Sequence, residues 1–303
     1  MHPNYVNGDL DKLDGELKEF KSAGAETCEL VLQGLDVIIG TRVIESRQDA
    51  LINILRKHDL DYTMHMPHGL NLLDTEMLDI YLEIFRSSIA FAKAAGIKLI
   101  NYHAGVIRRK RDEKPTAEGE TKPEGESKPD PATLIQNEAE QIKLLAASAP
   151  DITLCMENAL FGDNKEQEDF SAAVDTSSMI DFYNKVDMPN FKLTFDIGHR
   201  HLALDGNNDA LLADMEKLLP YIGHIHLHDN CGYRKEMREA FGGQRLVVGA
   251  GDIHLPLGWG TVPIKESLSL LKNYKGIINL EIEHRFSYHY SDAVSIVREY
   301  LAQ

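Results

Sequence analysis

The stretch Ile225-His226-Leu227-His228-Asp229 is a short apolar run that ends in side chains able to hold a divalent metal. Further runs of this kind are Tyr62-Thr-Met-His65, Ile100-Asn-Tyr-His103, Leu154-Cys-Met-Glu157, Leu193-Thr-Phe-Asp196 and Asn279-Leu-Glu281, together with Asp252-Ile-His254, which we expect on a loop. Single His, Asp and Glu residues are common in any chain. A metal-binding residue type at the end of nearly every strand-like run indicates that many strands finish at one place, and that this place binds metal.

Strand-like runs alternate with amphipathic helices along the chain. Strands are predicted at residues 26–32, 62–66, 98–103, 153–158, 192–197, 224–229 and 277–283. Helices are predicted at residues 9–23, 45–58, 74–95, 131–148, 176–186, 209–219, 263–273 and 291–301, where apolar residues recur at helical spacing. This alternation indicates parallel βαβ units and predicts an α/β fold, a single (β/α)8 TIM barrel over residues 1–303. The first strand is expected to be short or missing, because only residues 1–6 are available for it.

The composition excludes several classes of function. The chain of 303 residues has 48 acidic and 32 basic side chains and a net charge of −16, which disfavours tight binding to nucleic acid or to anionic membranes. Cys28, Cys155 and Cys231 lie far apart and form no Cys-x-x-Cys motif, as is typical of a reducing compartment. No signal peptide or membrane-spanning stretch is recognisable, so a cytoplasmic protein is predicted.

Two segments interrupt the alternation. Residues 108–130 open with four basic residues and continue almost without apolar side chains, which predicts a flexible polar loop over the mouth of the barrel. A tolerated surface insertion is the simpler interpretation of this loop. Residues 230–251 contain Arg234 and other basic side chains that could contact an anionic substrate, and a plain solvated loop is an equally good interpretation.

Four motifs together resemble the xylose-isomerase-like TIM-barrel superfamily, which groups sugar phosphate isomerases and epimerases with endonuclease IV. The motifs are Met156-Glu157-Asn158, Phe195-Asp196-Ile-Gly-His199, Ile225-His226-Leu-His-Asp229 and His254-Leu-Pro-Leu-Gly258-Trp-Gly260. The resemblance covers about residues 9–302, and the order and spacing of the motifs are specific for the superfamily but not for one reaction.

The resemblance implies a set of ligands for one to three divalent ions, Zn²⁺ or Mn²⁺ by donor type. The ligands are Glu157 as the bridging glutamate, Asp196, His226 and Glu281 for the ion shared by both branches, His65 and His103 for a second, and His199, Asp252 and His254 for a third. In the epimerase branch Glu157 and Glu281 would move protons. We expect His199, His228 and Arg234 to contact substrate. The chain departs from endonuclease IV in a longer insertion before Asp252 and in Trp259, where the family has Glu.

Two functions therefore remain open. The first is a metal-dependent isomerase or epimerase of a small sugar, sugar phosphate or polyol, with Glu157 and Glu281 relaying a proton through an enediolate. The alternative is a multi-metal phosphoester or phosphodiester hydrolase related to endonuclease IV, which the full ligand set favours. A metal-free binding protein with a barrel fold is a third interpretation, and the intact ligands argue against it. Cleavage of DNA at abasic sites is not expected from so acidic a chain. Nothing in the sequence excludes a homo-oligomer.

Overall fold

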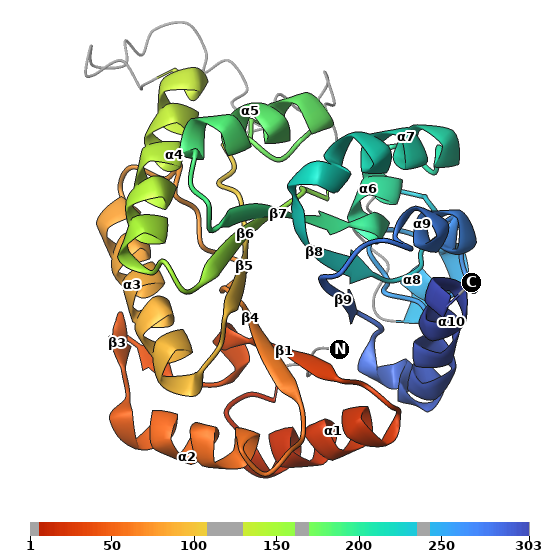
Figure 1. The fold of residues 1–303 in the computed structure, drawn as a ribbon, viewed down its shortest axis with the longest axis horizontal. Coiled ribbons are helices and arrows are strands. Elements are labelled where there is room, and N and C mark those ends of the chain that lie inside the picture. The colour runs from red at the N-terminus through yellow and green to blue at the C-terminus, as the bar shows by residue number, and fades with distance from the viewer. Residues whose placement is uncertain (1–5, 108–129, 161–169, 235–242, 303) are drawn as a thin grey trace, which may run out of the picture.

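The structure, a computed structural model, describes residues 6–107, 130–160, 170–234 and 243–302. One sheet of seven parallel strands curves into a barrel, and helices surround it (Figure 1). In sheet order the strands are β1 (Thr27–Val31), β4 (Asp61–His65), β5 (Leu99–His103), β6 (Thr153–Glu157), β7 (Phe191–Asp196), β8 (Ile222–Leu227) and β9 (Ile277–Leu280). The predicted α/β barrel of parallel strands is confirmed.

The barrel is not closed by a ladder between its first and last strands in the described part of the chain. The side-chain amide of Asn279 on β9 instead donates to Glu29 on β1, over 3.4 Å. Of residues 1–6, proposed for a first strand, only Val6 lies among the described residues, and it is buried. The prediction that this strand is short or missing therefore falls almost entirely outside the described residues.

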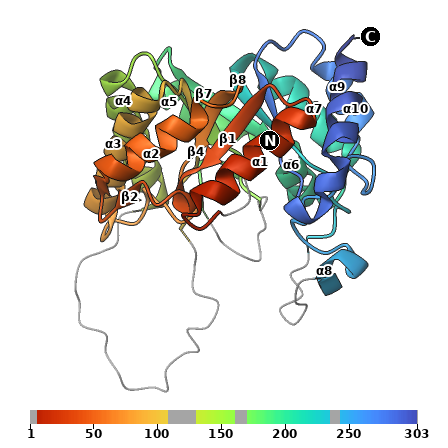
Figure 2. The same cartoon turned by 90° about the horizontal axis from the view of Figure 1, so that it is seen from below.

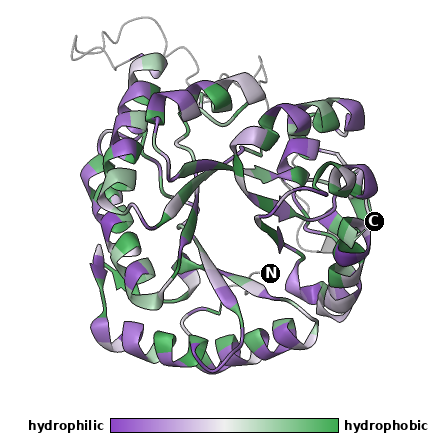
Figure 3. Ribbon diagram, in the orientation of Figure 1, coloured by the Kyte–Doolittle hydropathy of each residue, from purple (hydrophilic) through white to green (hydrophobic). Residues whose placement is uncertain are grey.

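The helices pack around the outside of the barrel, and in Figure 3 they carry both hydrophobic and hydrophilic residues, as amphipathic helices do. They are α1 (Leu10–Ser22), α2 (Glu45–Leu55), α3 (Leu78–Ala95), α4 (Pro131–Ser148), α5 (Thr176–Val186), α6 (Ile197–Ala203), α7 (Asn208–Leu218), α8 (Gly243–Val248), α9 (Ile264–Leu270) and α10 (Tyr290–Ala302). Asp9 caps α1 by accepting the N–H groups of Asp11 and Lys12, both over 3.0 Å. Gly96 ends α3 with a φ of 75°, a conformation that glycine adopts without strain.

Some short elements were not predicted from the sequence. They are a hairpin of β2 (Ile38–Ile39) and β3 (Arg42–Val43), the short helices η1 (Leu32–Gly34), η2 (Leu219–Tyr221) and η3 (His284–His289), and the helices α6 and α8. Helix α6 follows β7 without a loop, because the Asp196 carboxylate accepts the His199 N–H over 2.7 Å and caps the helix. Helix α8 lies in the 230–251 segment and projects from one face of the barrel (Figure 2).

The polar loop predicted at residues 108–130 lies outside the described residues except for Asp130. This residue caps α4 through the backbone N–H groups of Ala132 and Thr133. Among the described residues, no helix combines the length and apolar character that a membrane crossing requires.

The two faces of the strands differ in polarity. Outward-facing residues such as Leu30, Met64, Tyr102 and Phe195 are fully buried against the helices and form the apolar core. The inward-facing positions carry a buried polar set, which we call the interior layer: Glu29, Thr63, Asn101, Thr194, His224 and Asn279. Because side chains alternate along a strand, the next inward position is reached at or near the strand's C-terminal end. The interior layer is therefore the floor of the site described below.

Candidate metal centre

The C-terminal ends of the strands bring together the side chains that we call the strand-end ring: His65, His103, Glu157, Asp196, His226 and Glu281. Four of them are the last residues of β4, β5, β6 and β7, His226 is the last residue but one of β8, and Glu281 directly follows β9. All are buried except His103, which is partly exposed. The structure thus assembles at one place residues that the sequence spreads over more than two hundred positions.

Glu157 lies at the junction of two parts of the ring. Its Oε2 is 3.3 Å from Nε2 of His65 and 3.4 Å from Nε2 of His103. Its Oε1 is 3.1 Å from Nδ1 of His199 and 3.4 Å from Nδ1 of His226. A carboxylate with one oxygen directed to each side can bridge two cations, which is the place that the family resemblance implies for this residue.

His226 points its Nδ1 at three carboxylates. This atom lies 3.2 Å from Oε1 of Glu281 and 3.7 Å from Oδ2 of Asp196, in addition to its contact with Glu157. Glu157, Asp196 and His226 each direct a ligand atom toward a common point. One imidazole and three carboxylates form a donor set that suits Zn²⁺ or Mn²⁺.

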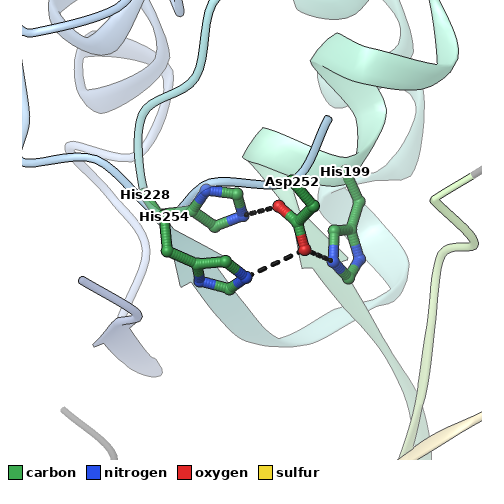
Figure 4. Close-up of side chains that lie close together, drawn as sticks. All are labelled: His199, His228, Asp252 and His254. Carbon is green, nitrogen blue, oxygen red and sulfur yellow. Dashed lines mark hydrogen bonds and ion pairs between the residues drawn. The ribbon is translucent and has the colours of Figure 1, made fainter. Parts of the chain in front are cut away.

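A second cluster, which we call the Asp252 group, consists of His199, His228, Asp252 and His254 (Figure 4). Oδ2 of Asp252 is 2.9 Å from Nε2 of His254 and 3.4 Å from Nε2 of His199. Its Oδ1 is 3.5 Å from Nε2 of His228. The rings of His228 and His254 stack with their centres 4.0 Å apart. His228, which we expected to contact substrate, therefore lies among these donor atoms and adds a fourth side chain to the three expected from the family.

The spacing of the donor atoms around Nδ1 of His226 fits a divalent cation better than a network of hydrogen bonds, whereas Nε2 of His254 and Oδ2 of Asp252, 2.9 Å apart, are at hydrogen-bond distance. Two tetrahedral ligands about 2.0–2.2 Å from one ion lie roughly 3.3–3.5 Å apart, whereas N–H···O hydrogen bonds measure about 2.7–3.2 Å. The contacts of His226 with ring carboxylates measure 3.2–3.7 Å. Buried atoms without a hydrogen-bond partner include Nδ1 of His226, Oδ2 of Asp196, Nδ1 of His199 and Oδ1 of Asp252. Buried polar atoms are normally paired, so the residues fit a metal.

The charges of the site alternate in sign. Burial alone would raise the pKa of Glu157, but His226 and His103 lower it well below its ordinary value. Burial would lower the pKa of His226, and Glu281 and Glu29 instead raise it well above the ordinary value. Against the same effect of burial, Asp252 raises the pKa of His254 to about 9. Glu157 is therefore ionised and His226 and His254 are protonated when no cation is bound, and a cation must displace the protons of these two imidazoles.

Hydrogen bonds from the interior layer hold the carboxylates of the ring. Asn101 donates its side-chain N–H to Oε2 of Glu157, and Thr194 in turn donates to Asn101 over 2.6 Å. Asn279 donates to Oε1 of Glu281 over 3.2 Å. Glu281 is thus anchored from below and faces His226 from the last strand, whereas its sequence neighbour Glu283 donates a backbone N–H to the carbonyl of His254.

Arg234, the arginine expected to contact substrate, forms an ion pair with Asp205 over 3.5 Å. Arg245, one of the other basic residues of the 230–251 segment, places Nη2 3.5 Å from the backbone carbonyl of Asp252. Of these two arginines, Arg245 is the one shown beside the Asp252 group. Trp259, at the departure from the family motif, is half-exposed and packs edge-on against Phe286 and His289.

Glu29 is the buried acidic residue near the site that sequence reasoning missed. It stands between Cys28 and Leu30, which face the helices and are fully buried. A glutamate in the middle of a predicted buried strand was the available signal, because such a carboxylate needs partners inside the barrel. His224 lies in the barrel interior as well and donates the proton on its Nε2 to Glu29 in a hydrogen bond of 2.8 Å.

Comparison with known proteins shows the family to which the chain belongs. The sequence profile described as "Xylose isomerase-like TIM barrel" matches residues 17–300. The chain therefore belongs to the xylose isomerase-like TIM barrel family. A segment of 129 residues is 31% identical to Uncharacterized protein MJ1311 of Methanocaldococcus jannaschii, covering 41% of this chain and 36% of that protein. A segment of 116 residues is 32% identical to the inosose dehydratase of Yersinia enterocolitica serotype O:8 / biotype 1B, covering 36% of this chain and 37% of the relative.

Solved structures show the same fold. A D-tagatose 3-epimerase-like protein superposes with a TM-score of 0.64 at 21% identity, over 91% of this chain and 88% of that one. A xylose isomerase-like TIM barrel protein from Mycobacterium smegmatis in complex with magnesium has a TM-score of 0.64 at 16% identity, over 98% of this chain and 92% of that one. At identities this low the two structures establish similarity of fold alone. The family includes enzymes, and epimerases and dehydratases are among those similar to this chain.

Proposed function

We propose that this protein is a divalent-metal-dependent isomerase or epimerase of a small sugar, sugar phosphate or polyol. The observation that carries the proposal is the approach of two carboxylates, Glu157 from β6 and Glu281 after β9, to Nδ1 of one imidazole, over 3.4 and 3.2 Å. They come from strands that two others separate in the sheet, so they reach the central position from different sides.

The proposed role of each residue follows from this arrangement. A divalent ion held by Glu157, Asp196, His226 and Glu281 would polarise a substrate carbonyl and its neighbouring hydroxyl. One of the two glutamates takes the proton from the carbon next to the carbonyl, which leaves an enediolate. The other glutamate returns a proton to the opposite face of the same carbon, or to the neighbouring carbon while the hydroxyl proton moves to the former carbonyl oxygen, so no oxidant or reductant is needed. His199, half-way between Glu157 and Asp252, holds a substrate hydroxyl.

Deuterium exchange tests this proposal directly. The protein, loaded in turn with Zn²⁺, Mn²⁺ or Mg²⁺, is incubated in D₂O with a panel of ketoses, aldoses, their phosphates and inosose-type cyclic ketones. Deuterium is expected on the carbon next to the carbonyl of one of them, and E157Q and E281Q should abolish the exchange. Product analysis separates isomerisation from loss of water, which begins with the same proton removal. Absence of exchange with every compound and every metal contradicts the proposal.

The second candidate function is hydrolysis of a phosphoester, and the Asp252 group is the observation that favours it. An isomerase of the kind proposed needs one ion, whereas further ligand clusters lie beside the central one, among them those around Glu157 with His65 and His103 and around Asp252. Several ions at such spacing could generate hydroxide and stabilise a leaving oxygen. Cleavage of bis-p-nitrophenyl phosphate, with more than one equivalent of metal by elemental analysis, would favour this function over the first.

A further inference from the structure

Glu29 lies directly beneath the strand-end ring, and all of its partners belong to the barrel interior. Its side chain is almost completely buried. Its Oε2 accepts hydrogen bonds from Nε2 of His224 over 2.8 Å and from the hydroxyl of Thr63 over 3.1 Å. Its Oε1 lies 2.9 Å from Nε2 of His226 and accepts the amide of Asn279 over 3.4 Å. Three hydrogen bonds and the close approach of His226 Nε2 thus surround the two oxygens of one buried carboxylate.

Glu29, His224 and His226 also direct ligand atoms toward one another closely enough to suggest an ion of their own. The spacing argues against that assignment. The two nitrogens stand 2.8 and 2.9 Å from Glu29, whereas two tetrahedral ligands of one ion lie roughly 3.3–3.5 Å apart. The contacts that His226 makes on its other side, at 3.2–3.7 Å, have the longer spacing. The two ring nitrogens of His226 therefore face two different kinds of partner.

We infer that Glu29 is a positioning residue for the metal centre. It keeps a proton on Nε2 of His226 and so leaves Nδ1 as the nitrogen that gives up its proton to a cation among Glu157, Asp196 and Glu281. The inference rests on the proposed metal-dependent function. The approach of Nε2 to Glu29 is bent, yet at 2.9 Å a carboxylate still attracts the proton on that nitrogen. A carboxylate bonded to the outer nitrogen of a metal-binding histidine fixes its ring and makes it a stronger ligand.

The substitution Glu29→Gln tests this role with little change in volume. The amide oxygen can accept a hydrogen bond from one imidazole, but its NH₂ group then faces the N–H of the other. We expect E29Q to bind Zn²⁺ about 10–100-fold more weakly, with the same number of ions at saturation, as measured by competition with a chromogenic chelator without substrate.

Glu138→Gln is the matched control. Glu138 is as deeply buried as Glu29, but it lies on α4 and accepts the backbone N–H of Gly105 over 2.7 Å, which glutamine can also do. E138Q should bind Zn²⁺ with the affinity of the parent chain. Thermal unfolding of both variants after chelator treatment shows whether each is folded before its affinity is compared.

A measurement on the parent chain keeps the inference testable if E29Q does not fold. Nitrogen-15 spectra of the Zn²⁺-loaded protein should show His226 with its proton on Nε2 and its Nδ1 coordinated. Coordination through Nε2 contradicts the inference, as does unchanged Zn²⁺ affinity in folded E29Q. Loss of one whole equivalent in E29Q, with the remaining affinity unchanged, also contradicts it, because Glu29 would then be a ligand of its own ion. If the parent chain binds no divalent metal, both the proposed metal centre and the role inferred for Glu29 are wrong.

Discussion

His224 and His226 lie on the same strand, face the same interior and are both fully buried, yet their electrostatic surroundings differ. Burial lowers the pKa of His224, and its contact with Glu29 does not outweigh that effect. For His226 the carboxylates of Glu281, Glu29 and Glu157 outweigh burial, and its pKa is raised well above the ordinary value. His224 and His226 are thus only two residues apart on one strand, but the first is a neutral, hydrogen-bonded imidazole and the second is surrounded by carboxylates.

The difference teaches how one barrel holds two polar layers with separate tasks. Polar groups of the interior layer form hydrogen bonds with one another, as Thr194 does with Asn101 and His224 with Glu29, although Nδ1 of His224 and Oδ1 of Asn279 have no partner. The strand-end ring above it keeps buried atoms without hydrogen-bond partners. The hydrogen bonds of the interior layer make it rigid, and the carboxylates and imidazoles of the ring that face one another without hydrogen bonds are receptive to a cation, so the first layer orients the second. Variants that separate the two layers test this division.

The largest effect is expected from Asp196→Ala, in the ring. It removes a carboxylate from the central cluster, so the central ion and all catalysis that depends on it should be lost, by about a thousandfold or more in kcat/KM. Circular dichroism should still show a folded barrel, since the interior layer and the apolar core are untouched. Elemental analysis checks the metal. A variant that retains the metal content of the parent shows that Asp196 is not a ligand.

A large but more local loss is expected from Asp252→Asn. This carboxylate faces the imidazoles of His199, His228 and His254, so its neutralisation should remove about one equivalent of metal and leave the central ion in place. Deuterium exchange on a sugar substrate should fall less than in D196A. If D252N also empties the central site, the Asp252 group and the ring are one centre rather than two.

A pH series gives a moderate effect of known sign. The pKa of His254 is raised to about 9 by Asp252, so this imidazole carries a proton at neutral pH that a cation must displace. Metal affinity of the Asp252 group should therefore rise by at least about tenfold per pH unit from 7 to about 9, the range over which His254 loses its proton. In the metal-free chain the sign is opposite for stability: the contribution is complete below about pH 6.5 and is lost as the pH rises to about 9.

The control for this series is the D252N variant, in which the main cause of the raised pKa is absent. Its metal-free unfolding temperature should change less between pH 6.5 and 9 than that of the parent chain. Equal slopes in the two proteins would show that His254 is not the group that titrates.

The smallest effect on metal is expected from His224→Gln, in the interior layer. The amide can still donate to Glu29, so Zn²⁺ affinity should stay within about threefold of the parent value. The free energy of unfolding should fall by about 1–3 kcal/mol, because the packing and one buried hydrogen bond are disturbed. Denaturant titration and chelator competition measure the two quantities. A hundredfold loss of Zn²⁺ affinity would show that His224, like His226, contributes directly to metal binding.

Local patterns in the sequence were sufficient to predict most of the fold. Helix caps such as Asp9 and Gly96, and apolar runs such as the one that ends at His226, depend on neighbours a few residues away. They predicted the order of strands and helices, and with it the edge at which ligand types gather. Helix α6 was missed because its start depends on one side-chain cap, Asp196, rather than on an extended apolar pattern.

Local sequence patterns could not predict which side chains of the site contact one another. Glu29 and His224 are separated by 195 positions in the chain, and they meet only because the curvature of the sheet brings β1 round to the side of β8 and β9. The same is true of Arg245, whose place beside Asp252 depends on how the segment after β8 folds back. His228 was expected at the substrate, whereas the direction of its ring toward Asp252 follows from that same loop.

The sequence by itself determined the alternation of strands and helices and the residue types at the strand ends, because backbone periodicity and capping are local properties. Only the tertiary structure decided which donor atoms face one another and at what spacing, because that depends on the curvature of the whole sheet. Asp196 shows both: its place at a strand end could be predicted, but the unpaired Oδ2 that it directs toward His226 could not. A local pattern determines the backbone position of a side chain, and the packing of distant segments determines which atoms that side chain contacts.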